Sequence, residues 1–440
     1  MNPVPYTEHQ LAALDVSQRD LDACVVAGPG SGKTTVLVEY FRRLVEAGVD
    51  PSRILAITFT EKAAANMRKK LAEAFKEDRE MGAKLERAWV STVHGFCARM
   101  LRENAVFAGV DPEFSVADER ESWRLQQESI GQAVAEVFAD RPAAVRDLIA
   151  GLSSPHFEEA VLSAYDAMRG AGISVEQAAA IAPPAGATRQ QIAQALAELR
   201  ADPLHRWEPK QRFYRNEIVG QTERILETPG PREGLCAIAN FSVSLNKCKR
   251  DTPAYELVRH LRDNLIDGLE YSFITELYER ERKVLLEILR RFDRIYRTRK
   301  RQAGVLDFAD LEEFAVRILE EHHETRVRVQ NQFEHIVMDE FQDTNGQQAR
   351  LLELVRRQGR FYAVGDINQS IFGFRHADPD VFREYRGQVQ RQLELDDNFR
   401  SRPGILSAVE TIVHDAAGIE QRRLVAGRLF DQPRSVCVEA

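Results

Sequence analysis

A glycine-rich stretch near the amino terminus has the residue types and the spacing of a phosphate-binding loop. AGPGSGKTT, residues 27–35, matches the pattern G-x-x-x-x-G-K-[ST] from Gly32 to Thr34, with Ala27 at the position of the first glycine and Gly28 directly after it. Backbone N–H groups of such a loop surround phosphates, its lysine bridges the β- and γ-phosphates, and its threonine hydroxyl binds Mg²⁺. We therefore predict a nucleoside-triphosphate and Mg²⁺ site, with these residues at the phosphates: Gly28, Gly30, Ser31, Gly32, Lys33, Thr34 and Thr35.

A pair of acids follows an apolar run much later in the chain. HIVMDEFQD, residues 335–343, has Asp339 and Glu340 at the end of a predicted strand. Alone, such a pair is an ordinary strand end. Beside a phosphate loop, the aspartate is expected to hold Mg²⁺ and the glutamate to orient or deprotonate the attacking water. We assign Asp339 to the metal and Glu340 to catalysis.

The stretch VGDINQSIFGFRHA, residues 364–377, combines an amide with aromatic and basic side chains. Gln369 is neutral and cannot act as a base, but its amide can hydrogen-bond a γ-phosphate oxygen or the attacking water. Phe372, Phe374 and Arg375 carry planar groups on which bases could stack. The alternative interpretation is a strand end followed by core phenylalanines and a surface arginine. These residues alone leave both interpretations open.

The elements that would carry these groups follow from the hydrophobic pattern. Apolar runs at residues 22–28, 54–60 and 88–94 are each followed by a helical pattern, and further strand patterns occur at 333–340, 360–366 and 390–397. Alternation of this kind predicts an α/β fold with a parallel sheet. Residues 101–303 have amphipathic helical patterns instead. We predict a motor-type domain from residues 1–100 and 304–395, with a large, mainly helical domain at 101–303 inserted into it.

Composition narrows the classes of protein. The chain has 440 residues, a net charge of −8 and no apolar run near the roughly 18 residues of a membrane span. Its first residues lack the pattern of a signal peptide. Its five cysteines form no CxxC pair, which argues against a disulfide framework or a zinc site. We expect a cytoplasmic protein without a membrane partner.

Residues 280–302 are strongly basic within this acidic chain. Their basic side chains recur at helical spacing. Two interpretations remain open: a solvated helix face, or a track for nucleic-acid phosphates.

The motifs in their order resemble the superfamily 1 DNA helicases of the UvrD, Rep and PcrA type. That resemblance is carried by YTEHQLAAL, AGPGSGKTT, ITFTEKAAANMRKKL, STVHGFCARML, MDEFQDTNGQQ, VGDINQSIFGFRHA and LDDNFRSRPGIL. Within this group, TFTEKAAANM, TVHGFC, AGVDPEFSVADE and GVLDFADLE are more similar to the AddA and RecB recombination-helicase subunits. The resemblance implies a RecA-like P-loop NTPase domain that uses ATP and Mg²⁺.

The resemblance also implies roles for individual residues. On the nucleotide side, Gln10 would read the adenine edge, Gln342 and Gln369 would sense the nucleotide, Phe399 would stack on adenine, and Arg400 would reach the γ-phosphate. On the DNA side, the expected residues along the single-stranded path are Phe59, Thr60, Thr92, His94, Phe374 and Arg375. A plain core position remains the alternative for Phe59 and for His94.

The sequence departs from the family pattern at several positions. Phe374 replaces the more usual Trp, Phe399 replaces a frequent Tyr, and Thr35 stands where many relatives have Arg. Both aromatic replacements keep a stacking face but lose a polar group. The later family motifs are absent, so residues 396–440 are expected to begin an incomplete second RecA-like domain. The chain resembles the amino-terminal part of such a protein.

Three functions therefore stand beside one another. The first is an ATP-dependent translocase or helicase on single-stranded DNA that acts in DNA repair or recombination. The resemblance implies 3′ to 5′ polarity. The partners expected for it are single-stranded and duplex DNA and an AddB-like subunit. The second is a nucleotide- and DNA-binding module with little or no ATP turnover, because the second motor domain is missing. The third, an unrelated P-loop enzyme such as a small-molecule kinase, does not explain the glutamine, aromatic and arginine positions.

Overall fold

The computed structural model of the protein describes residues 6–76, 78–85, 87–151, 156–181, 186–203, 209–244, 252–373, 376–414, 419–420 and 422–427. The chain divides into two compact units. The first consists of Met1–Leu125, Ala164–Ile173 and Thr298–Ala440, and the second of Gln126–Ser163 and Ser174–Arg297. None of the helices in the described ranges is both long and apolar enough to cross a membrane.

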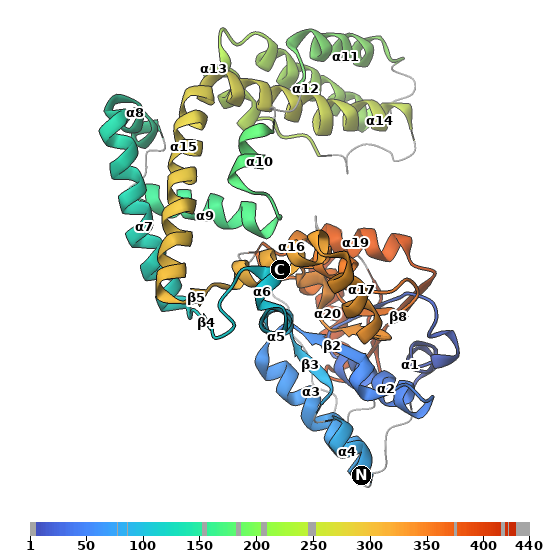
Figure 1. The fold of residues 1–440 in the computed structure, drawn as a ribbon. Helices are drawn as coiled ribbons and strands as arrows, with labels where there is room; N and C mark the ends of the chain where they lie inside the picture. The colour runs from blue at the N-terminus through green and yellow to red at the C-terminus, as the bar shows by residue number, and fades with distance from the viewer. Residues whose placement is uncertain are drawn as a thin grey trace. The chain divides into compact units, whose positions relative to one another are not determined.

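A six-stranded parallel sheet forms the centre of the first unit (Figure 1). The strand order is β3-β2-β6-β7-β1-β8, and every neighbouring pair is parallel. The strands are β1 (Ala23–Ala27), β2 (Ile54–Thr58), β3 (Trp89–Thr92), β6 (His335–Met338), β7 (Phe361–Gly365) and β8 (Arg391–Leu395). The predicted α/β fold with a parallel sheet is confirmed, and its strands come from two separated parts of the chain.

Side chains of the central strands are buried on both faces of the sheet. In β2, Leu55 and Ile57 belong to one apolar core, while Ile54 and Ala56 belong to the core on the opposite face. Successive side chains of a strand point to opposite faces, so a strand covered on both sides must be apolar throughout. This is why the strands appear in the sequence as continuous apolar runs.

Helices cover both faces of the sheet. One core includes residues of α2 (Lys33–Glu46) and α3 (Glu61–Ala74). The other includes residues of α5 (Val93–Glu103), α6 (Ala105–Ala108), α16 (Phe308–Glu321), α17 (His323–Gln332), α18 (Gly346–Val355) and α19 (Pro379–Gln388). The short helices α1 (Glu8–Ala13) and α4 (Arg79–Leu85) complete the amino-terminal part.

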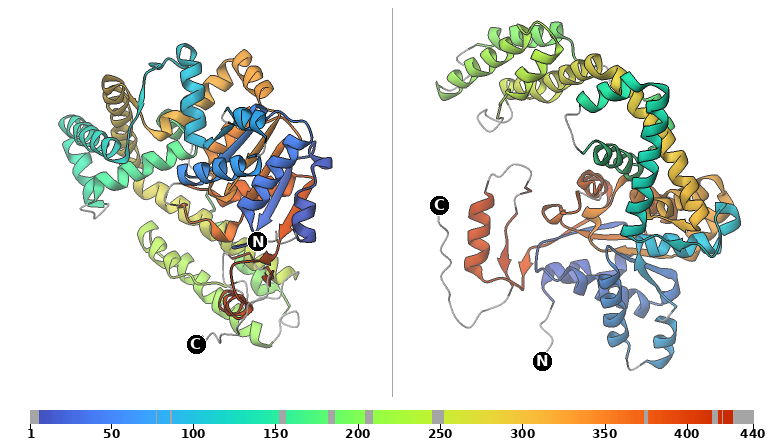
Figure 2. Two further views of the ribbon diagram at one scale, coloured as in Figure 1. Left: turned by 90° about the horizontal axis from the view of Figure 1, so that it is seen from below. Right: turned by 90° about the vertical axis from the view of Figure 1, so that its left-hand side faces the viewer.

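Two short strand pairs join distant parts of the first unit. β4 (Ser115–Val116) pairs with β5 (Val305–Leu306), and β9 (Asp397–Asn398) pairs with β10 (Val425–Ala426). Helix α20 (Pro403–Val413) lies between β9 and β10 in the chain. This carboxy-terminal segment, drawn in red, lies beside the blue amino-terminal part of the unit (Figure 2).

The second unit is helical throughout its described part. Its helices are α8 (Pro142–Gly151), α10 (Val175–Ala180), α11 (Arg189–Ala201), α12 (Pro209–Leu226), α13 (Pro231–Ala239), α14 (Pro253–His260) and a π-helical stretch, Leu261–Ile266. Three helices have residues in both units: α7 (Glu119–Asp140), α9 (Phe157–Gly170) and α15 (Asp267–Ala303). An apolar core joins α11, α12, α14 and the start of α15, which gather together in Figure 1.

The basic segment 280–302 lies on α15, and several of its side chains pair with carboxylates. Arg291 contacts Asp140 at 2.6 Å, and Arg294 contacts Glu136 at 3.0 Å. These pairs join α15 to α7, which runs beside it (Figure 1). Because acids of the same unit neutralise these arginines, the pairs favour a helix-packing face over a phosphate track.

A buried charge cluster fixes the start of α16 in the first unit. Arg169 contacts Asp307 at 3.1 Å and Asp310 at 2.8 Å, while Lys300 contacts the same two acids at 2.6 and 2.5 Å. Glu313 adds a third carboxylate, 3.1 Å from Arg169. Burial alone would raise the pKa of Asp307, but the charges of Arg169 and Lys300 lower it below its ordinary value. Asp307 also caps α16 by accepting a hydrogen bond from the Asp310 N–H.

Candidate nucleotide site and nucleic-acid interface

The phosphate loop lies between the end of β1 and the start of α2. Gly30 and Gly32 have φ values of 74° and 87°, in the left-handed region that favours glycine. A β-carbon on Gly30 would lie 2.7 Å from the Arg400 β-carbon, so no larger residue fits there. Helix α2 begins at Lys33, and its free N–H groups therefore point toward the loop. Ser31 is buried and donates to the Gly28 carbonyl at 2.8 Å, whereas Thr35 is exposed.

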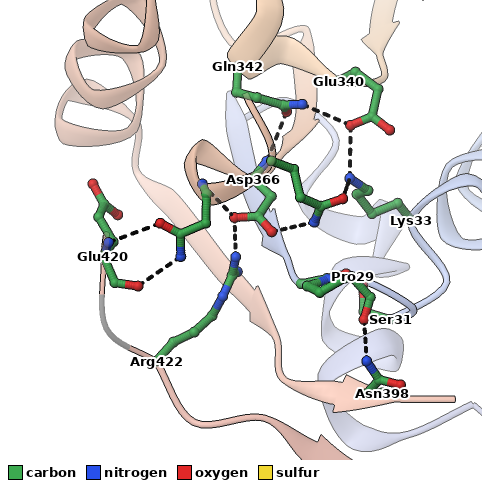
Figure 3. A network of polar contacts seen from close by, with 12 residues as sticks. Pro29, Ser31, Lys33, Glu340, Gln342, Asp366, Asn398, Glu420 and Arg422 are labelled. Atoms are coloured by element: carbon green, nitrogen blue, oxygen red, sulfur yellow. Dashed lines mark hydrogen bonds and ion pairs between the residues drawn. The ribbon is translucent and has the colours of Figure 1, made fainter. Parts of the chain in front are cut away.

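The structure brings Lys33 and Thr34 of the phosphate loop together with predicted site residues that follow two other strands. Lys33 Nζ lies 2.8 Å from Glu340 Oε2 and 3.1 Å from Gln369 Oε1. Thr34 donates its hydroxyl to Asp339 Oδ2 at 3.3 Å. All of these groups follow parallel strands at the carboxyl edge of the sheet, where ligands of open α/β sheets bind. Figure 3 shows Lys33 between Glu340 and the loop after β7.

In the acidic pair, the charged form of Asp339 and the backbone conformation of Glu340 are both unfavourable. Asp339 is only 5% exposed, and burial and the neighbouring Glu340 charge raise its pKa to about 6, against the lowering effect of Lys33. Glu340 has a φ of 53°, which is rare for a residue with a side chain and marks local strain. A hydroxyl oxygen beside a carboxylate oxygen matches the hard oxygen ligands that Mg²⁺ takes. Thr34 and Asp339 therefore fit the predicted metal role.

Gln342 connects this acidic pair to the loop after β7. Its amide nitrogen donates to Glu340 Oε2 and to Asp343 Oδ2, each at 3.0 Å, and its amide oxygen accepts from the Asp366 N–H at 2.9 Å. A β-carbon on Gly365 would lie 2.7 Å from that amide oxygen, so only glycine allows this approach. Gln369 donates in turn to the Asp366 carboxylate. Gln342 and Gln369 thus share one hydrogen-bond network with Lys33 (Figure 3).

Gln10 lies against the phosphate loop from outside the sheet. It is 7% exposed, its amide nitrogen donates to the Ser31 carbonyl at 3.0 Å, and its amide oxygen accepts from the Thr7 N–H at 3.2 Å. This fixes the orientation of the amide. Its role at an adenine edge stays a prediction.

The segment after β8 also contacts the phosphate loop. Phe399 donates its N–H to the Gly30 carbonyl at 2.9 Å, while the Arg400 side chain is exposed. Arg422 forms an ion pair with Asp366, which sequence reasoning missed because no motif marks that arginine (Figure 3). The predicted roles of Phe399 at adenine and Arg400 at the γ-phosphate stay predictions.

Aromatic side chains lie close together where DNA contacts were predicted. The rings of Phe59 and Phe372 are 4.7 Å apart, and both residues are half-buried. Phe59 is therefore not a fully enclosed core residue, and it presents part of a ring for stacking. Phe374 and Arg375 lie outside the described residues.

The two predicted threonines cap helices. Thr60 accepts from the Ala63 N–H at 3.1 Å at the start of α3, and Thr92 accepts from the Gly95 N–H at 3.1 Å at the start of α5. Thr92 is buried and donates its hydroxyl to Glu61 Oε1 at 2.8 Å. Helix amino termini attract phosphates through their free N–H groups. A direct phosphate contact of either hydroxyl stays a prediction.

His94 occupies a partly exposed position beside an aromatic ring that sequence reasoning did not assign. Its Nε2 lies 2.8 Å from Glu312 Oε1, and its ring lies 4.5 Å from that of Phe308. The His94 side chain is 29% exposed, and Phe308 is 45% exposed. Phe308 belongs to the GVLDFADLE stretch, and its exposure is what identifies it as a further stacking candidate.

The fold and the site define a class of protein. A phosphate loop after β1, with an acidic pair at the end of β6 beside it, is the arrangement of a P-loop nucleoside triphosphatase. Residues 6–390 match the model of the UvrD/REP helicase N-terminal domain, and the chain belongs to that family.

Curated relatives share its sequence over most of its length. It is 30% identical to an ATP-dependent helicase/nuclease subunit from Exiguobacterium sibiricum over 476 residues, covering 93% of this chain and 40% of the relative. The protein of the same name from Pelotomaculum thermopropionicum is 30% identical over 490 residues, covering 92% and 38%. That from Geobacillus thermodenitrificans is 28% identical over 500 residues, covering 94% and 40%. The chain thus spans about 40% of the length of these relatives.

Proposed function

We propose that the chain carries the first motor domain of an ATP-dependent translocase or helicase that moves 3′ to 5′ on single-stranded DNA in repair or recombination. ATP would lie on the phosphate loop, with Mg²⁺ at Thr34 and Asp339. Lys33 would contact the β- and γ-phosphates, and Glu340 would orient or deprotonate the attacking water. Magnesium would supply charge neutralisation on the phosphate oxygens.

One observation carries this proposal. Lys33 Nζ lies within 3.1 Å of both Glu340 and Gln369, which come from the ends of two different strands. When ATP binds, Lys33 would contact the γ-phosphate in place of Glu340. Gln369 would then contact the same phosphate or the water, so a single event at the nucleotide changes the hydrogen bonds of the loop after β7.

The aromatic positions support DNA as the track. Phe59, Phe372 and Phe308 are partly exposed, and His94 lies against Phe308. Partly exposed rings on one unit provide the stacking surfaces that single-stranded nucleic acid binds without sequence preference. In this proposal Phe374 and Arg375 extend that surface, and Thr60 and Thr92 place helix amino termini near the phosphates.

We further propose the division of the chain. Residues 1–100 and 304–395 would form the motor domain, with a helical domain inserted at 101–303, and residues 396–440 would begin a second RecA-like domain that supplies Phe399 and Arg400. The helical composition of Gln126–Ser163 and Ser174–Arg297 supports an insertion. The relatives are named as subunits of a helicase/nuclease, which supports an AddB-like partner and duplex DNA as the substrate that is opened. DNA as the substrate supports a cytoplasmic site of action.

ATP hydrolysis by the 440-residue chain, measured with Mg²⁺ and with or without an oligothymidylate, tests this function. We expect turnover that single-stranded DNA stimulates and that Lys33→Ala reduces about 100-fold, because the lysine contacts the charge that develops in the transition state. Lys283→Ala, at an exposed position of α15, is the matched control and should behave as wild type. Turnover that survives Lys33→Ala would contradict the proposal. Lys33-dependent binding of ATP and DNA without turnover would favour a binding module instead.

A further inference from the structure

Glu312 is a buried carboxylate that three side chains from other elements approach. It lies on α16 with its side chain 5% exposed. Its Oε1 lies 2.8 Å from His94 Nε2 and accepts from Gln348 Nε2 at 2.7 Å, while its Oε2 accepts from Asn345 Nδ2 at 3.4 Å. A buried carboxylate is stable only where donors of this kind compensate for lost water. The site is therefore built around the glutamate.

This contact fixes the state of the histidine ring. Both Glu312 oxygens accept from amide N–H groups of Asn345 and Gln348, so they act as acceptors here, and His94 Nε2 is the donor of the third bond. The ring is held between this bond and the Phe308 ring, 4.5 Å away. Its Nδ1 is therefore left for another partner. Of the hydrogen-bonded pair, His94 is the partly exposed member, and with Phe308 it belongs to the proposed DNA path.

The other two donors come from the segment that follows the acidic pair. Asn345 caps α18 by accepting from the Gln348 N–H at 2.8 Å, and both residues follow Glu340 within eight positions. Gln342, between them and Glu340, bonds Glu340 directly at 3.0 Å. A displacement of this segment at the nucleotide would act on Glu312, and through Glu312 on His94. The connection consists of the backbone between Gln342 and Asn345 and of the hydrogen bonds to Glu312, which are 2.7 to 3.4 Å long. Hydrogen bonds weaken steeply as their geometry departs from linear.

We propose that Glu312 is a positioning residue: it fixes the tautomer and ring orientation of His94 for single-stranded DNA and ties that histidine to the start of α18. The part that concerns DNA rests on the proposed function. The part that concerns the ring does not, because it follows from the hydrogen bonds alone.

A spectroscopic test isolates the ring. In protein labelled with ¹⁵N-histidine, with the signal assigned by its loss in His94→Gln, we expect His94 Nε2 of the wild type to be protonated and its proton to exchange slowly with water. Glu312→Gln has nearly the same shape but only one acceptor oxygen, so it cannot serve all three donors. The variant should show averaged tautomers and faster proton exchange. Glu320→Gln, on the exposed side of α16, is the control. An unchanged His94 signal in Glu312→Gln would overturn the proposal.

A binding measurement tests the consequence for DNA. Oligothymidylate affinity of Glu312→Gln should fall roughly fivefold to tenfold, the effect of a lost hydrogen bond to a charged group. The double variant Glu312→Gln with His94→Gln should bind DNA no more weakly than His94→Gln alone, because the two substitutions remove the same interaction. Additive losses would overturn the proposal. A wild type that does not bind DNA, with the ring signals as expected, would refute the proposed function and leave the positioning of His94 intact.

Discussion

Two buried aspartates of the first unit have opposite electrostatic surroundings. Asp307 is 7% exposed and Asp339 is 5% exposed, so burial disfavours the charged form of both. Arg169 and Lys300 nevertheless lower the pKa of Asp307, whereas burial and Glu340 raise the pKa of Asp339 to about 6. A buried carboxylate whose charge is neutralised by neighbouring cations, as in Asp307, needs no further ligand. A buried acid short of positive charge is a candidate site for a cation.

The two aspartates therefore make opposite contributions to stability as pH changes. The lowered pKa of Asp307 stabilises the fold above its ordinary value of 3.8, and this contribution is lost as pH falls through the lowered folded-state value. The raised pKa of Asp339 gives a contribution that is fully present below 3.8 and is lost as pH rises through about 6. At neutral pH the charged Asp307 stabilises the fold, whereas the charged Asp339 destabilises it.

The largest expected effect comes from removing a cation of the Asp307 cluster. Arg169→Met should lower the free energy of unfolding by about 3 to 5 kcal/mol, because it removes one of the two cations, Arg169 and Lys300, that the buried carboxylates contact. Chemical denaturation measures this. Arg350→Met, which removes an exposed pair with Glu320, is the control and should cost only about 0 to 1 kcal/mol. Equal losses in the two variants would show that the cluster is no more than a surface pair.

The opposite change is expected at the acidic pair. Asp339→Asn removes a strained charge and should stabilise the chain without nucleotide by roughly 1 to 3 kcal/mol at pH 7.5, as its pKa of about 6 implies. The gain should shrink toward pH 4, where the wild-type aspartate is protonated. Thermal unfolding at both pH values checks this, with Asp307→Asn as the contrasting variant that destabilises. A loss of stability in Asp339→Asn at pH 7.5 would contradict the comparison.

A smaller effect should separate the two regions by function. Phe308 follows Asp307 directly in the chain and is 45% exposed. Phe308→Ala should weaken oligothymidylate binding roughly tenfold, because it removes a ring on which a base could stack. It should leave the affinity for Mg²⁺ and an ATP analogue unchanged. Phe107→Ala, also at an exposed ring of the first unit, is the control. Equal DNA affinity of Phe308→Ala and wild type would remove Phe308 from the DNA path.

The strands, and the grouping of the phosphate loop with the acidic pair, could be predicted from sequence because each has a local pattern. The phosphate loop occupies nine consecutive residues, and the buried strands appear as apolar runs. The placement of Asp339, Glu340 and Gln369 beside the phosphate loop could be predicted because each follows such a run, and parallel strands end at one edge of the sheet. These inferences needed only short windows of sequence.

Contacts between distant positions could not be predicted in this way. Arg169 and Asp307 are 138 positions apart, and His94 and Glu312 are 218 apart. No periodicity indicates which acid a buried arginine or histidine meets. The same holds for Arg422 at Asp366, and for residues 164–173, which belong to the first unit although their helical pattern lies within the predicted insertion.

Reciprocal binding of nucleotide and DNA tests the central claim that the acidic and aromatic regions act together. The measurement is the dissociation constant of an oligothymidylate with and without a non-hydrolysable ATP analogue and Mg²⁺. We predict a change of about fivefold or more, and an equal effect of DNA on the affinity for the analogue, as linkage requires. Lys33→Ala should abolish the change. A DNA dissociation constant that is the same with and without nucleotide, in a wild type that binds both, would contradict the account.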